Sequence, residues 1–165
     1  MLAFGFTSLL ILSSCTSYVD KTYGPVDFEL SLEDGDDMLF EGPNEGIITI
    51  PFKPEEYNIE KSTIGGMRLD QITLEIDNEE GFGIFENLKV EVSSEATSSL
   101  TIGVLNETTN DKKITIKGLE EAKIENFNQV DEFYLIIEGN LIQDLDVPVN
   151  MKGSLSLLVE SSEKE

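Results

Sequence analysis

The feature that most constrains the fold of this chain is the alternation of apolar and polar residues with a period of two. The segment 26–32 reads VDFELSL, in which every second residue is apolar. The same pattern recurs in the segments 48–52, 72–76, 88–92, 100–104, 114–116 and 147–159. Successive side chains of a strand point to opposite faces of its sheet, so this pattern predicts half-buried antiparallel strands.

Two segments depart from the alternation. Phe133–Ile137 reads FYLII and is apolar without a break, which predicts a central strand that is covered on both faces. Near residues 119–130, apolar residues recur every three positions at Ile124, Phe127 and Val130, which predicts at most a short helix.

Together these segments predict an all-β protein. There are eight strand candidates, separated by turns rich in Gly, Pro and Asn, and no strong helix pattern. We therefore expect residues 26–160 to form one antiparallel β-sandwich of about eight strands, immunoglobulin-like in arrangement. A β-barrel is the alternative architecture.

The first fourteen residues, MLAFGFTSLLILSS, carry no charged side chain. They are too few to span a bilayer as a helix, which needs about 20 apolar residues. They have the length of the apolar region of a signal peptide, although no Lys or Arg precedes them. The alternative is a buried first strand that carries a core cysteine.

The segment Leu12-Ser13-Ser14-Cys15 resembles the lipobox of bacterial lipoproteins, and Cys15 is the single cysteine of the chain. The resemblance implies that residues 1–14 are a signal peptide and that Cys15 carries acyl chains such as palmitate. Residues 15–25 would then form a tether. Thr16 follows the cysteine, where an aspartate would imply inner-membrane retention, so the resemblance implies the outer membrane, on its periplasmic or exposed side.

The whole layout is similar to small envelope lipoproteins of Bacteroidetes-type bacteria, which join a lipobox to an acidic β-sandwich domain. The likeness rests on the lipobox, the order of the strands and the closing strand Val147–Val159. The function of those proteins is generally unassigned, so no functional residue is carried over to this chain.

Composition excludes several classes of function. The net charge is −22, from 33 acidic and 11 basic residues, and such a field repels nucleic acid. The chain has no histidine, which removes Ser-His-Asp triads, Cys-His dyads and nearly all zinc and copper sites. No nucleotide-binding glycine motif is present. We therefore expect a protein that is not an enzyme and that needs no cofactor.

The sequence gives little support for a protein that cleaves or binds carbohydrates. A pair of carboxylates is enough for a glycosidase, but 33 acidic residues produce many pairs by chance. Sugar binding usually needs exposed aromatic rings, and the chain has no tryptophan. Of its tyrosines, Tyr18 and Tyr23 fall in the predicted tether and Tyr134 falls in the apolar run, which leaves Tyr57.

Calcium is the one metal that the sequence suggests. Asp34, Asp36 and Asp37 are clustered, but Met38 and Leu39 stand where an EF-hand loop needs an oxygen ligand and a glycine. A looser site at these aspartates, or at Asp77, Asn78 and Glu79, is the alternative to a plain acidic turn.

The leading functional hypothesis is a lipid-anchored protein of the cell envelope that acts as a non-catalytic binding or structural module. Its partner would be an envelope protein or glycan, bound by loops at one end, such as 34–45 and 106–111, or by an edge strand. One alternative is a carboxylate-dependent hydrolase of envelope polysaccharide. Another is an accessory subunit of a secretion or surface-assembly complex, which would show an exposed apolar patch.

Overall fold

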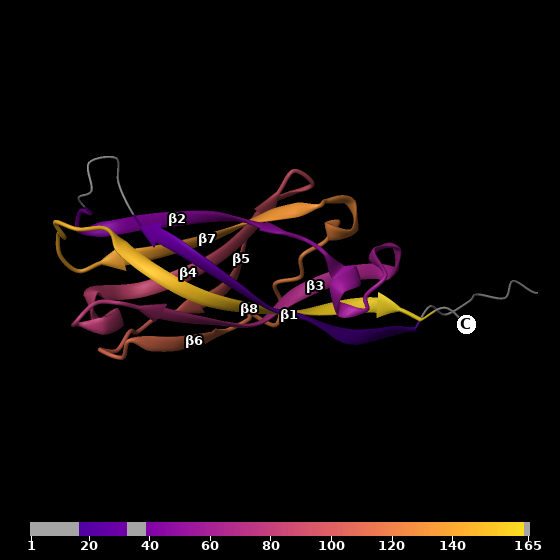
Figure 1. Ribbon diagram of the computed structural model, residues 1–165, viewed down its shortest axis with the longest axis horizontal. Helices are drawn as coiled ribbons and strands as arrows, with labels where there is room; N and C mark the ends of the chain where they lie inside the picture. Colours follow the sequence, from indigo (N-terminus) through magenta and orange to yellow (C-terminus); the bar gives the residue numbers. More distant parts are fainter. Residues whose placement is uncertain (1–16, 33–38, 164–165) are drawn as a thin grey trace, which may run out of the picture.

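The computed structural model describes residues 17–32 and 39–163. In this part of the chain there are eight strands and four short 3₁₀ turns (Figure 1). The strands are β1 (Tyr18–Leu32), β2 (Gly42–Pro51), β3 (Ile64–Ile76), β4 (Phe85–Ser94), β5 (Thr97–Leu105), β6 (Lys113–Lys117), β7 (Glu132–Leu141) and β8 (Val149–Ser162). The 3₁₀ turns are η1 (Pro54–Tyr57), η2 (Lys61–Thr63), η3 (Gly81–Ile84) and η4 (Phe127–Gln129).

The strands form two four-stranded antiparallel sheets, with the orders β1-β8-β3-β6 and β2-β7-β4-β5. The predicted β-sandwich of eight strands is confirmed, and the barrel alternative does not apply. The immunoglobulin-like arrangement was wrong. In that fold the first two strands are neighbours in one sheet, whereas here β1 pairs with β8 and β2 lies in the opposite sheet. Eight strands in this order form a jelly roll.

Hydrogen bonds join the connections at each end of the sandwich. At one end, which we call the distal end, Leu39 and Leu145 exchange backbone hydrogen bonds of 2.9 and 2.8 Å, and Phe82 N donates to Asp111 O at 3.0 Å. The distal end thus holds the β1–β2, β3–β4, β5–β6 and β7–β8 connections. At the opposite end Glu163 N donates to Ser17 O at 3.2 Å, so the two ends of the described chain lie side by side.

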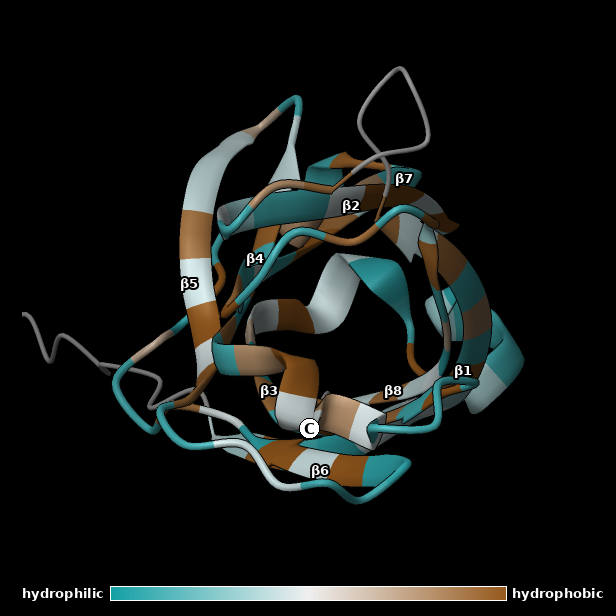
Figure 2. Cartoon of the chain, turned by 90° about the vertical axis from the view of Figure 1, so that its left-hand side faces the viewer, coloured by the Kyte–Doolittle hydropathy of each residue, from teal (hydrophilic) through white to brown (hydrophobic). Residues whose placement is uncertain are grey.

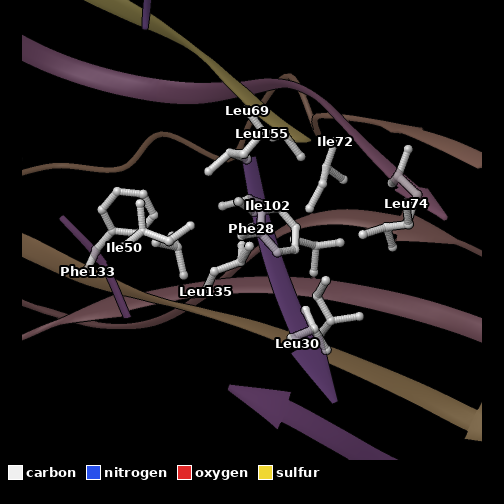
Figure 3. Packing of buried hydrophobic residues seen from close by; sticks show 14 of the residues in the cluster. Phe28, Leu30, Ile50, Leu69, Ile72, Leu74, Ile102, Phe133, Leu135 and Leu155 are labelled. Carbon is white, nitrogen blue, oxygen red and sulfur yellow. The ribbon is translucent and has the colours of Figure 1, made fainter. Parts of the chain in front are cut away.

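The interior is filled by the inward faces of both sheets. Seen from the distal end, the two sheets enclose a common core (Figure 2). Ile72 and Leu74 of β3 point toward the same interior as Ile102 of β5 and Leu135 of β7 (Figure 3), and each of these side chains is at most 1% exposed. The alternating pattern in the sequence therefore identified the inward face correctly.

Strand β1 begins eight residues earlier than the sequence indicated. The predicted tether 15–25 is wrong from Tyr18 onward, because Tyr18–Tyr23 pair with β8. The register shifts between Tyr23 and Val26, so these two inward residues are three positions apart and break the alternation. Gly24 within this bulge has φ +114°, and a Cβ there would lie 2.5 Å from Leu155 O, so only glycine fits.

Tyr23 fastens this early part of β1 to the core. Its side chain is 2% exposed, and its ring centroid lies 5.1 Å from that of Phe52 and 4.6 Å from that of Tyr57. The Tyr23 hydroxyl donates to Pro51 O at 3.1 Å and accepts from Lys53 N at 3.3 Å. Burial raises the pKa of Tyr23, although the hydrogen bond from Lys53 opposes the shift.

The segment 119–130 contains only the single turn η4, so the expectation of at most a short helix is confirmed. Ile124 is extended and exchanges backbone hydrogen bonds of 2.9 and 2.7 Å with Met67. Phe127 is buried, with its ring centroid 5.7 Å from that of Phe52 and 5.4 Å from that of Phe133. The three-residue spacing thus reflects a loop that packs under the end of the sandwich. None of the turns described in residues 17–32 and 39–163 has the length and apolar character of a membrane-crossing helix.

Strand β7 is central, as predicted, because it lies between β2 and β4. The prediction that both of its faces are covered is wrong. Phe133, Leu135 and Ile137 are buried, but Tyr134 is 36% exposed and Ile136 is only half-buried. The outward face of this sheet therefore carries an aromatic ring that the sequence had placed in the core.

Candidate functional site

The outward face of the β2-β7-β4-β5 sheet combines apolar and hydrogen-bonding side chains. We call it the tyrosine face. It is defined by the outward residues of three rows: Glu45, Ile47, Thr49, Lys89, Glu91, Ser93, Thr101, Val104, Tyr134, Ile136 and Glu138. The strand register orders these residues into rows across the sheet. Thr49, Tyr134 and Ser93 form the first row.

The second row contains Ile47, Ile136, Glu91 and Thr101, and the third contains Glu45, Glu138, Lys89 and Val104. The apolar half of the face is formed by Ile47, Tyr134 and Ile136 of β2 and β7, in the first two rows. The polar half is formed by Glu91, Thr101, Lys89 and Glu138, in the second and third rows. Ile47 is 56% exposed. A ligand laid across the middle of the sheet would touch both halves.

The polar half is fixed by a small charged network. Lys89 Nζ lies 3.1 Å from Glu138 Oε2 and 3.5 Å from Glu91 Oε1. Glu91 also accepts hydrogen bonds from Thr101 Oγ1 at 2.9 Å and from Ser99 Oγ at 3.0 Å. Five side chains from three strands thus hold one another in place, and the polar groups are positioned before any ligand arrives.

The pKa values of this network follow from these contacts. Partial burial of Glu91 acts to raise its pKa, but the hydrogen bonds from Thr101 and Ser99 and the positive charge of Lys89 outweigh it and leave the pKa lowered. The hydrogen bond to Glu138 raises the pKa of Lys89 against a smaller effect of desolvation. Both groups are therefore charged at neutral pH, as hydrogen-bonding and electrostatic contacts require.

This arrangement suits binding better than hydrolysis. A glycosidase needs one carboxyl that keeps its proton near neutral pH, and Glu91, with its lowered pKa, does not supply one. Two hollows of the described structure lie on the opposite sheet, and catalytic groups are usually gathered in a concave site. The network therefore has the character of a recognition surface.

The opposite sheet carries a shallow polar groove. Two hollows of about 590 and 760 Å³ share Glu29, Glu75 and Lys152 in their linings. Lys152 Nζ lies 3.4 Å from Glu29, and Lys113 Nζ lies 4.0 Å from Glu75. These pairs are mostly exposed, and the only aromatic residue in the linings, Phe28, is buried. Such loose surface pairs contribute little energy.

The site residues predicted from the sequence lie elsewhere. Cys15 and the calcium candidates Asp34, Asp36 and Asp37 fall outside the described residues. In the second acidic segment, Asn78 Oδ1 accepts a hydrogen bond from Glu80 N at 2.8 Å and shapes a turn. Among the residues that the structure describes, no three acidic, His or Cys side chains gather in a way that would hold a metal ion.

The two loops predicted to bind a partner are 34–45 and 106–111. The described part of the first lies beside the β7–β8 connection at Leu145, and the second lies beside the β3–β4 connection at Phe82. The described part of the first loop is tied down, since Glu41 N donates to Asp144 Oδ1 at 2.7 Å and Asn44 Nδ2 donates to Phe40 O at 2.8 Å. Phe40, Ile142 and Val147 are each more than half exposed there.

Sequence reasoning missed the tyrosine face because it read FYLII as a unit. The residues that follow this run indicate which of its side chains point outward. Residues 134, 136, 138 and 140 are Tyr, Ile, Glu and Asn, so the positions that share a parity with Tyr134 become polar toward the end of the strand. Residues of one parity lie on one face, and polar ones mark the outward face.

Comparison with known proteins assigns no family to this chain. No family model matches it, and no curated protein sequence matches it. A two-domain protein of unknown function from Bacteroides fragilis is 12% identical over 86% of this chain, with a TM-score of 0.38. This chain spans 44% of the length of that protein.

Two other similar structures are covered over almost their whole length. A carbohydrate-binding module described for specific mannan recognition is 12% identical, with 85% of this chain and 95% of the module covered and a TM-score of 0.38. The BFDV capsid protein is 10% identical, with 89% and 99% covered and a TM-score of 0.32. At these levels of similarity the comparisons identify neither a family nor a ligand.

Proposed function

We propose that this protein is a non-catalytic binding module of the cell envelope that recognises a glycan on its tyrosine face. The single observation that carries the proposal is the outward position of Tyr134 beside Ile136 and Ile47, one or two rows from the fixed charges of Glu91 and Lys89. A sugar ring has an apolar C–H face and hydroxyl groups around its edge. The two halves of the tyrosine face match these two surfaces.

The rigidity of the face supports the same proposal. Tyr134 and Ile136 project from β7, which pairs with β2 on one side and with β4 on the other. A side chain on a central strand loses little backbone freedom on binding, so less of the interaction energy is consumed by ordering. A weak contact with each sugar unit is then sufficient for a polymer that offers many units.

The location in this proposal rests on the lipobox resemblance. Acyl chains on Cys15 would each contribute about 0.8 kcal/mol per buried methylene, and two or more chains give stable anchoring. Two residues, Thr16 and Ser17, separate Cys15 from the start of β1. They extend over about 7 Å at most. The end of the sandwich that carries Ser17 would thus stand next to the outer membrane, and the distal end would point away from it.

Affinity electrophoresis in gels that contain soluble glycans tests the function. We expect the wild-type protein to be retarded by at least one glycan, and Tyr134→Ala to bind at least about tenfold more weakly, which corresponds to about 1.4 kcal/mol. Tyr18→Ala is the matched control, since Tyr18 is 54% exposed and lies on the other sheet. Equal retardation of wild type and Tyr134→Ala would remove the tyrosine face from the proposal.

A further inference from the structure

We infer that the glycan bound by the tyrosine face is uncharged, and that Glu91 accepts hydrogen bonds from its hydroxyl groups. This inference rests on the proposed function and narrows it to a class of ligand. Three features of the face support it: its charges, the free acceptor positions of Glu91 and the position of Lys89.

The charges of the face disfavour acidic glycans. Among the described residues of its three rows, Lys89 is the only cation, and it is already engaged by Glu138 at 3.1 Å and by Glu91 at 3.5 Å. Glu45 stands directly across from Glu138 in the strand register. A chain of uronate or phosphate groups would therefore meet an excess of carboxylates and no free cation.

The acceptor positions favour a ligand that donates hydrogen bonds. An ionised carboxylate has about four lone-pair positions. In Glu91, Oε1 accepts from Thr101 and lies 3.5 Å from Lys89, while Oε2 accepts from Ser99. At least one lone pair of Oε2 is therefore available to a ligand. The Glu91 side chain cannot change its rotamer without losing its contacts with Thr101, Ser99 and Lys89. Sugar hydroxyls are suitable donors, and hydrogen bonds to an ionised acceptor are the stronger kind.

The position of Lys89 disfavours amino sugars. Its ammonium group lies between the carboxylates of Glu91 and Glu138, which is the place where an ammonium group of a ligand would gain most. A cationic sugar would have to approach a like charge there or displace it. An uncharged glycan meets neither cost, and its C–H face rests on Tyr134 and Ile136.

Isothermal titration with three soluble polymers tests this inference: mannan as the uncharged glycan, alginate as the acidic one and chitosan oligomers as the cationic one. We expect mannan or another uncharged glycan to bind with an affinity that changes less than about twofold between about 50 and about 500 mM NaCl, since a neutral ligand is hardly affected by screening. We expect alginate not to bind.

Two variants on the face sharpen the test. Glu91→Gln keeps the size of the side chain and is expected to weaken the binding of the uncharged glycan by about tenfold. Glu29→Gln is the matched control, since Glu29 is exposed on the opposite sheet, and it should leave that affinity unchanged. Lys89→Met removes the cation and is expected to gain binding to chitosan oligomers. Circular dichroism of each variant establishes that it is folded.

The outcomes separate this inference from the proposed function. Binding of alginate, or binding of chitosan by the wild type that collapses at high salt, overturns the uncharged class and leaves a glycan-binding module. An unchanged affinity in folded Glu91→Gln overturns the role of Glu91. Failure of every glycan, with Tyr134→Ala indistinguishable from wild type, overturns the proposed function itself.

Discussion

Glu91 links the stability of the molecule to its recognition surface. Its pKa is lowered because the hydrogen bonds from Thr101 and Ser99 and the charge of Lys89 outweigh the effect of burial. A carboxyl whose folded-state pKa lies below its unfolded value contributes stability above the unfolded pKa. That contribution is lost as the pH falls from about 4.5 through the folded-state pKa. The network around Glu91 is therefore strongest near neutral pH.

Thr101→Val removes one hydrogen bond to Glu91 while it keeps the shape of the side chain. We expect the free energy of unfolding to fall by about 1 kcal/mol at pH 7 and by less at about pH 3.5, because the contribution of a lowered pKa begins to be lost once the pH falls below the unfolded-state value of a Glu carboxyl. Urea unfolding at both pH values measures the difference. Thr115→Val is the control, because Thr115 Oγ1 contacts only the neutral Thr73 hydroxyl, at 3.3 Å. An equal loss for Thr101→Val at both pH values would contradict the assignment.

At the level of elements, the sequence predicts what is local and periodic. Alternation located the inward faces of the strands, because it depends only on the side chains of one segment. It failed at the bulge between Tyr23 and Val26, where one shift of register ends the pattern while the strand continues. It also failed for β7, where Tyr134 and Ile136 are apolar but point outward. Hydrophobicity alone does not separate a covered face from an exposed recognition face.

The extent of β1 has a direct test. A chain that starts at residue 17 keeps the whole strand, whereas one that starts at residue 26 loses Tyr18–Tyr23 and the buried ring of Tyr23. Loss of a buried aromatic side chain costs about 3–5 kcal/mol. We expect the first truncation to melt at the wild-type temperature and the second to melt far lower or not to fold. Equal melting temperatures by circular dichroism would mean that residues 18–25 act as a tether after all.

The order of strands in the whole molecule was beyond sequence patterns. The pair β1–β8 joins residues more than a hundred positions apart, such as Phe28 and Gly153. The ring of Phe28 packs where a Gly153 side chain would stand, so a Cβ at Gly153 would lie 2.2 Å from its Cζ. The fit between the ring of Phe28 and the glycine at 153 cannot be recognised before it is known that these two segments pair. Alternation therefore indicated a sandwich but could not distinguish a jelly roll from an immunoglobulin-like arrangement.

The proposed attachment of the molecule to a membrane depends on Cys15. We expect Cys15→Ser to lose metabolic labelling by palmitate and to move from the membrane fraction to the soluble fraction, because the anchoring energy comes from the acyl chains. Fractionation of cells that express each form measures this change. Tyr134→Ala is the control and should keep both the label and the membrane location. A labelled or membrane-bound Cys15→Ser protein would contradict the lipobox resemblance.

The hydrogen bond between Ser17 and Glu163 has a consequence for engineering. Because the two ends of the described chain meet there, a short peptide can join them, and a new opening can be made in the loop 106–111. Such a circular permutant would keep every strand pair, since surface loops and adjoining ends are the places where rearrangement is tolerated. If the proposed lipid anchor were placed at the new amino terminus, it would sit at the opposite pole of the sandwich, and the end that carries Ser17 and Glu163 would point away from the membrane.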